Sequence, residues 1–325
     1  MKRFLTKVVL FSIALWVMAL ALDYTLCRGL LRMEDARFQD YSAMLSGGME
    51  HDILIMGNSR GKSHFDPFLI DSLCNVSSFC IGVGGYPFNV QLAKYQLYRE
   101  HNKKPKTIIQ NVDHGTISIL ADVRHQHQSE QFFPLFYDSL GRKLLRELGY
   151  GFKELYIPLY RFGGYQMDIK NGLLEALHIK HYISRPAYKG HLPEEGPWDG
   201  SELQKMSVMP IRFSDEAKAL FEEYLDQCER DSIKVILVNS PMYVGAFEKM
   251  TGVEEMREYY RTVAETHHTV YLDYTENCEI SQDTSNFCVS VHMNPQATRS
   301  FTKLFCKDMK ELGLVANDDV IKSIH

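Results

Sequence analysis

The sequence predicts an α/β fold in which helices cover a parallel, doubly wound sheet. Short apolar runs rich in Ile, Leu and Val alternate along the chain with longer segments that have helical periodicity. Such runs fit strands buried on both faces, and strands that alternate with helices form parallel sheets. Polar residues suited to catalysis follow the ends of several runs, where open α/β sheets place their sites.

Five strands are expected, at Asp52–Met56, Val76–Ile81, Lys106–Val112, Ile233–Asn239 and Thr269–Asp273. Helices are expected at Pro67–Leu73, Val90–Glu100, Ser214–Arg230, Val253–His267 and Pro295–Leu312. Ser214 is a favourable N-cap with acidic residues after it, and Pro295 suits the first position of a helix.

The amino terminus predicts a membrane-anchored protein. Lys2, Arg3 and Lys7 precede the apolar segment Val8–Leu22, which approaches the ~20 residues that span a bilayer. Positive charges before such a segment keep that end cytoplasmic, so the domain that follows is expected outside the cytoplasm, in the periplasm or at the cell surface. We expect residues 1–22 to remain as an anchor; Ala19-Leu20-Ala21 leaves a cleaved signal peptide as the alternative.

The rest of the chain is expected to form one domain with an insertion. Residues 23–50 read as a polar, helical connector, 51–315 as the α/β domain, 116–213 as its insertion and 316–325 as a tail. The insertion is rich in Phe and Tyr, which predicts a largely helical, aromatic-packed segment; an aromatic platform for a sugar is the alternative. The polar run Arg124-His125-Gln126-His127 has no carboxylate cluster beside it and is not expected to hold a metal.

Composition excludes several classes of function. The 325 residues carry a formal net charge of -5 without a basic stripe, so no nucleic-acid partner is expected. The seven cysteines form no CxxC pair and show no zinc-ligand spacing, which predicts mostly buried thiols. A phosphate-binding P-loop is not expected at Gly61-Lys62-Ser63. Such a loop needs four residues between its two glycines, and Gly57 and Gly61 enclose only three. No metal or cofactor is expected.

A serine and a histidine are the candidates for catalysis. Ser59 follows the first predicted strand at the turn Gly57-Asn58-Ser59, and His292 lies in the loop before the last helix. Serine attack on an ester needs a base for its proton and N–H donors for the oxyanion. We expect Ser59 as nucleophile, His292 as base, and the backbone N–H groups of Ser59 and Gly85 as donors. Ser59 as a mere helix cap and His292 as a structural histidine remain the alternatives.

Four segments resemble the conserved blocks of the SGNH (GDSL-like) hydrolase superfamily: GNSR at 57–60, CIGVGG at 80–85, IIQNVDHG at 108–115 and FCVSVHMN at 287–294. The resemblance implies a flavodoxin-like three-layer α/β/α sandwich. It makes Ser59 the nucleophile, Gly85 the oxyanion glycine and His292 the catalytic histidine. Asn111 and His114 fall in the block that supplies the last oxyanion donor. Anchored, exported members of the superfamily move acyl groups on cell-envelope polymers, which implies an esterase or O-acyltransferase of an envelope glycan.

The chain departs from the family pattern at the acid. The aspartate expected three residues before the histidine is replaced by Val289. The site then works as a Ser59–His292 dyad, or Asp283 or Asp273 substitutes for the acid, or catalysis is lost. In the last case the chain is a binding or scaffold protein of an envelope-modification complex.

Overall fold

The structure, a computed structural model, describes residues 1–120, 122–123, 128–275 and 278–315. The chain folds as two compact units, Met1–Ser46 with Asp122–Ala187, and Gly47–Ala121 with Tyr188–His325. The expected boundaries therefore shift: most of the connector joins the first unit, and residues 188–213 of the expected insertion join the second. The run at 124–127 and the tail at 316–325 lie outside the described residues.

The second unit is built on a five-stranded parallel sheet in the order β2-β1-β3-β5-β7. Its strands are β1 (Ile53–Met56), β2 (Ser78–Cys80), β3 (Thr107–Asn111), β5 (Lys234–Asn239) and β7 (Val270–Asp273). All five predicted strands are present, each within the expected range. In chain order the strands run 2-1-3-4-5, the flavodoxin-like order, whose topological switch point lies between β1 and β3. The predicted fold class is confirmed.

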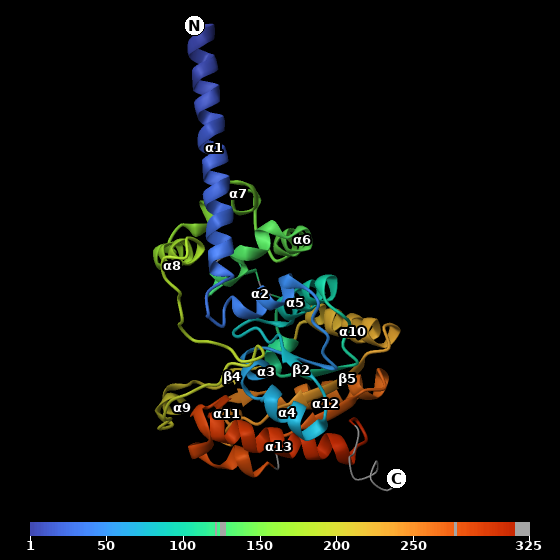
Figure 1. Ribbon diagram of the computed structural model, residues 1–325. Coiled ribbons are helices and arrows are strands. Elements are labelled where there is room, and N and C mark those ends of the chain that lie inside the picture. The colour runs from blue at the N-terminus through green and yellow to red at the C-terminus, as the bar shows by residue number, and fades with distance from the viewer. Residues whose placement is uncertain (121, 124–127, 276–277, 316–325) are drawn as a thin grey trace. The chain divides into compact units, whose positions relative to one another are not determined.

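Helices cover both faces of this sheet (Figure 1). Ile53 and Ile55 pack with α4 (Pro67–Cys74) and α13 (Pro295–Glu311) in one core. The other face carries α5 (Phe88–His101), α10 (Asp215–Arg230) and α12 (Val253–Thr266), joined through rings such as Phe88 and Phe221, whose centroids are 5.0 Å apart. Successive strand residues point to opposite faces, so both faces of each strand need apolar residues.

The helix ends follow the predicted caps. The Ser214 hydroxyl accepts a hydrogen bond from the N–H of Ala217, and Pro295 stands at the start of α13, directly after the N-cap Asn294.

Short elements complete the second unit: α3 (Ser59–Ser63), η1 (His114–Thr116), α9 (Ser201–Lys205), β4 (Met209–Pro210), α11 (Val244–Phe247), β6 (Met250–Thr251), η4 (Glu279–Gln282), η5 (Thr284–Asn286), β8 (Phe287–Val289) and β9 (His292–Met293). β8 and β9 form an antiparallel hairpin directly before α13.

The first unit is helical. It contains α1 (Lys2–Leu30), α2 (Gln39–Ser46), η2 (Ser129–Tyr137), α6 (Ser139–Glu147), α7 (Phe152–Tyr156), η3 (Tyr160–Phe162) and α8 (Gln166–Ala176). Many of its aromatic rings are buried and pack against one another; the centroids of Phe133 and Phe162, for example, are 4.9 Å apart. This arrangement favours the packing interpretation of the aromatic residues over the sugar platform.

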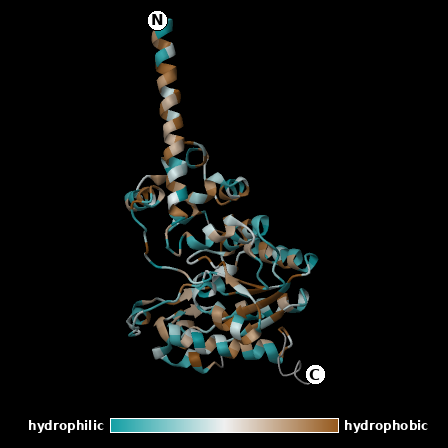
Figure 2. Cartoon of the chain, in the orientation of Figure 1, coloured by the Kyte–Doolittle hydropathy of each residue, from teal (hydrophilic) through white to brown (hydrophobic). Residues whose placement is uncertain are grey.

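Helix α1 has two parts with different surroundings. Its first two thirds are apolar and exposed, which by length and composition makes α1 a candidate membrane span or signal sequence (Figure 2). The helix continues past Leu22, the expected end of the anchor, to Leu30, so the expected helical connector begins as part of the same helix. Asp23 is buried, pairs with Arg161 and accepts hydrogen bonds from the Tyr137 hydroxyl at 2.7 Å and the Leu159 N–H at 2.6 Å. The last turns of α1 are therefore an integral part of the first unit.

The cysteines are unpaired thiols. Six are buried and Cys288 is half-buried, in accordance with the expectation of core thiols.

Candidate active site

Ser59 is presented by a sharp turn between β1 and α3. Gly57 has a φ of +143°, and a Cβ there would lie 2.8 Å from Cβ of Asn111, so only glycine fits. The Asn58 side chain caps α3 by accepting a hydrogen bond from the N–H of Arg60 at 3.0 Å. The alternative in which Ser59 is the cap is therefore wrong. Ser59 is the first residue of α3, and its hydroxyl is available for another partner.

That partner is His292. Its Nε2 lies 2.8 Å from Oγ of Ser59, although 233 positions separate the two residues. His292 opens β9 and pairs with Val289 across the hairpin, so the turn between β8 and β9 fixes the position of His292. When Nε2 accepts the serine hydroxyl proton, Nδ1 carries the ring hydrogen of the neutral imidazole. This is the arrangement in which a histidine acts as a base toward serine.

Both burial and nearby charges shift the pKa of His292. Burial lowers the pKa of His292, and the positive charge of Arg60 lowers it as well; the carboxylates of Glu194, Glu202 and Asp113 raise it. The net result is a pKa below the ordinary 6.5 of histidine. The imidazole is therefore neutral, and able to accept a proton, at neutral pH.

Neither acid suggested by the sequence lies at His292. Asp283 is exposed and accepts a hydrogen bond from the N–H of Ser285 at 2.9 Å. Asp273 lies 3.2 Å from Nε of Arg257 and accepts a hydrogen bond from the N–H of Thr275 at 2.9 Å. In the part of the chain that the structure describes, no protein group is hydrogen-bonded to Nδ1 of His292.

The glycine-rich turn after β2 lies beside the serine. Its position is fixed by a 2.9 Å hydrogen bond from the N–H of Val83 to the carbonyl of Gly57. A Cβ on Gly84 would lie 3.8 Å from Cβ of Ser59, whereas a Cβ on Gly85 would meet nothing within 4 Å. Among the described residues, the N–H groups of both glycines have no hydrogen-bond acceptor. Gly84 is thus the glycine that packs against Ser59, and Gly85, the expected donor, follows it in the same turn.

The other two expected oxyanion donors differ in their availability. The side-chain nitrogen of Asn111 donates to the carbonyl of Val238 at 2.7 Å and lies 3.3 Å from Oγ of Ser240. Both of its hydrogens are engaged, so Asn111 braces β3 against the segment after β5. His114 begins η1, is half-buried, and lies next to the buried carboxylate of Asp113.

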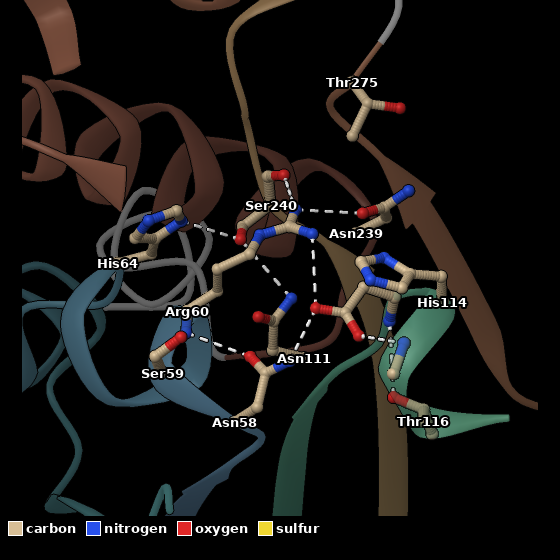
Figure 3. A network of polar contacts seen from close by, with 12 residues as sticks. Asn58, Ser59, Arg60, His64, Asn111, His114, Thr116, Asn239, Ser240 and Thr275 are labelled. Atoms are coloured by element: carbon tan, nitrogen blue, oxygen red, sulfur yellow. Dashed lines mark hydrogen bonds and ion pairs between the residues drawn. The ribbon is translucent and has the colours of Figure 1, made fainter. Parts of the chain in front are cut away.

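A buried polar network supports the turn that carries Ser59 (Figure 3). Arg60 is 4% exposed and makes three contacts: it lies 3.5 Å from a carboxylate oxygen of Asp113, donates to Oδ1 of Asn239 at 3.0 Å, and donates to the carbonyl of Ser240. Asn58 donates to the same Asp113 oxygen at 2.7 Å. Burial alone would raise the pKa of Asp113, but the charges of His114 and Arg60 and these hydrogen bonds lower it. Asp113 therefore remains a carboxylate.

A second histidine, His64, connects this network to the hairpin of His292. The N–H of Met293 donates to Nε2 of His64 at 3.2 Å, so Nδ1 carries the hydrogen and donates to Oγ of Ser240 at 2.8 Å. Burial and the charge of Arg60 hold the pKa of His64 well below its ordinary value, which keeps the ring neutral in this role. The only signal in the sequence for His64 is its position five residues after Ser59, which by itself does not indicate a site residue.

Comparisons with known proteins add little to this description. No family model matches the chain, and a search of curated proteins finds no match. Among solved structures, the chain is similar to a protein of Bacteroides fragilis NCTC 9343 that is provisionally described as an acylhydrolase. The TM-score is 0.38 and the sequence identity is 11%, and the match covers 84% of this chain and 95% of that chain. A likeness of this size carries no conclusion about chemistry, which rests on the contacts given above.

Proposed function

We propose that the chain is a serine esterase or O-acyltransferase of the SGNH type, with Ser59 as nucleophile and His292 as general base. The 2.8 Å contact between Nε2 of His292 and Oγ of Ser59 carries this proposal. It joins two residues from opposite ends of the domain at the carboxyl edge of a parallel sheet, next to its switch point, where ligands of such folds bind. The four sequence blocks that resemble the SGNH superfamily support it.

The proposed reaction has two halves. In the first, Oγ of Ser59 attacks the ester carbonyl while Nε2 of His292 takes the hydroxyl proton; the tetrahedral intermediate then expels the alcohol, which receives that proton. In the second, water or an acceptor hydroxyl attacks the acyl-serine, His292 takes its proton, and Ser59 leaves as the restored hydroxyl. Water yields a free acid, whereas an acceptor hydroxyl yields a new ester.

The oxyanion of each intermediate needs donors placed in advance. The N–H of Ser59 and that of Gly84 are our candidates, because Gly84 packs against Ser59 and its N–H has no acceptor among the described residues. Gly85 is the neighbouring alternative, since its N–H is equally without an acceptor there.

We place this activity outside the cytoplasm, on an acylated glycan of the cell envelope. The location is supported by the exposed apolar part of α1 and the positive charges before it. The substrate class is supported only by the resemblance to anchored envelope O-acyltransferases and esterases. A non-catalytic scaffold in an envelope-modification complex is the second candidate, favoured by Val289 at the position of the family's acid.

The test uses the full chain in detergent. We expect a fluorophosphonate probe to label the wild type, and p-nitrophenyl acetate to be hydrolysed; Ser59→Ala and His292→Ala should lose both reactions. Circular dichroism and gel filtration verify that each variant is folded. A folded wild type that neither reacts with the probe nor turns over the ester would overturn the catalytic proposal in favour of the scaffold.

The pH dependence of the hydrolysis follows from the lowered pKa of His292. The base must be neutral, so kcat/KM should decline only as the pH falls through the pKa of His292, which lies below 6.5. A pH profile of kcat/KM between 4.5 and 9 measures this, in about half-unit steps. An acid limb with its midpoint above 6.5 would contradict the burial argument.

A further inference from the structure

Helix α1 leaves the first unit at a well-defined level. From Phe4 to Leu22, every residue of the helix except Ala19 is exposed, and Asp23 is the first that is buried. The stretch from Phe4 to Leu22 rises about 27 Å, close to the ~30 Å of a hydrocarbon core. With α1 in the membrane, as we propose, the outer boundary of the hydrocarbon core therefore falls near Leu22.

Two segments of the first unit contact α1 at this level. The Tyr137 hydroxyl lies 3.4 Å from the carbonyl of Leu20, and the Tyr137 ring centroid lies 5.1 Å from that of Tyr24. The N–H of Leu159 donates to the carboxylate of Asp23 at 2.6 Å. These contacts bring the end of η2 and the chain just before η3 to the depth at which α1 leaves the hydrocarbon core.

Exposed aromatic side chains gather around these contacts. Tyr160 directly follows Leu159 and is 48% exposed, and Phe152 of α7 is 72% exposed. The ring of Tyr156, also exposed, has its centroid 5.1 Å from that of Phe152. In Figure 1, α7 lies beside α1 at the edge of the first unit from which the exposed part of the helix projects. Together with two exposed tyrosines at α1, these residues form what we call the aromatic cluster: Tyr24, Tyr137, Phe152, Tyr156 and Tyr160.

Two basic side chains lie at the rings of the aromatic cluster. Arg146 donates to the Tyr156 hydroxyl at 2.5 Å, and Nζ of Lys153 lies 5.9 Å from the centroid of the Tyr160 ring. Both basic residues are exposed. Long basic side chains at a membrane surface lay their stems on apolar groups and keep their charges in water. The cluster thus combines apolar rings, hydroxyls and positive charges, which suits the phosphate-bearing headgroup layer of a bilayer.

We propose that the aromatic cluster is a membrane-surface site, with its rings in the headgroup layer of the bilayer that α1 spans. This inference rests on the proposed location of α1 in the membrane. The occupant follows from continuity, because the exposed rings adjoin the exposed apolar surface of α1 and are attached to it at Leu20 and Asp23. Tyrosine suits this depth because its ring is apolar and its hydroxyl stays hydrated. The first unit then has two attachments to the bilayer, the helix and the cluster.

The test measures the depth of one ring of the cluster in phosphatidylcholine liposomes that contain the full chain. The chain has two tryptophans, Trp16 and Trp198, and replacing both by Phe removes the background signal. Tyr160→Trp in that background then provides a single reporter. We expect lipids brominated near the headgroup to quench its emission, and acrylamide in the water to quench it weakly. Tyr156→Trp repeats the measurement at a second ring, should the first variant fail to fold.

Ile179→Trp in the same background is the matched control. Ile179 is an apolar residue of the same unit and is 66% exposed. It directly follows His178, whose Nε2 lies 3.0 Å from Nη1 of Arg32, just beyond the other end of α1. Acrylamide should quench this reporter, and brominated lipid should not. Equal quenching of the two reporters by brominated lipid, or none in Tyr160→Trp, would overturn the membrane role of the cluster.

Native Trp16 separates this inference from the anchor on which it rests. It lies in the exposed apolar part of α1 and is the sole tryptophan of Trp198→Phe. Brominated lipid should quench it when α1 is in the membrane. An unquenched Trp16 overturns the anchor, whereas a quenched Trp16 with an unquenched Tyr160→Trp overturns only the membrane-surface site. Both readouts are independent of any reaction at Ser59.

Discussion

The double variant Ser59→Ala/His292→Ala should hydrolyse an acyl ester no more slowly than Ser59→Ala alone. The two side chains perform one proton transfer across a 2.8 Å contact, so removal of either abolishes the same step. We expect each single variant, and the double variant, to lose kcat by a similar factor of up to about 10⁶, the scale set by loss of the serine or the histidine from such a unit. Steady-state hydrolysis of p-nitrophenyl acetate by the four chains measures this cycle.

Asp283→Asn is the matched control for that experiment. It removes a carboxylate close to His292 in sequence, while Oδ1 of the asparagine still caps the N–H of Ser285. Because Asp283 is exposed and caps a turn, its replacement should leave kcat/KM unchanged. Losses that add in the double variant would mean that Ser59 and His292 act separately, and a large loss in Asp283→Asn would return that carboxylate to the role of the acid.

The fold was predictable because local sequence determines most of it. Runs such as Ile53–Met56 are apolar at every position, which only a strand buried on both faces requires. Helices after such runs imply parallel strands, and parallel strands bring their carboxyl ends to one edge. The convergence of Ser59 and His292 at that edge follows from the same topology, without any information about side chains.

The residues around the pair were not predictable in the same way. Asn111 follows the rule for a site residue, since it ends β3, yet its amide is engaged by Val238 of the neighbouring strand. Glu194 lies in a stretch rich in Gly and Pro with no periodicity, so no pattern indicates that it returns to Cys288. The sequence around Asp23 is polar, so no pattern indicates that this residue is buried with Arg161 and ties the end of α1 to the first unit.

The second large effect concerns stability and the buried pair beneath the serine. Arg60→Met should lower the free energy of unfolding of the second unit by about 3–5 kcal/mol, because it takes the buried guanidinium away from the buried carboxylate of Asp113. Asn239 and Ser240 lose a donor at the same time. Equilibrium urea unfolding in a Trp16→Phe background measures the change, since Trp198 is then the only tryptophan and reports on the second unit.

A second ion pair of the same unit shows why burial, not distance, decides the size of the effect. Lys106 and Asp52 approach more closely, 2.8 Å against 3.5 Å for Arg60 and Asp113, but the Lys106 side chain is 83% exposed. Water already solvates both of those charges, so Lys106→Met should barely move the urea midpoint. Arg60→Met/Asp113→Leu removes both buried charges and should recover part of the stability lost in Arg60→Met. A midpoint that falls further in this double variant would show that Asp113 is held by Asn58 and Gly115 rather than by Arg60.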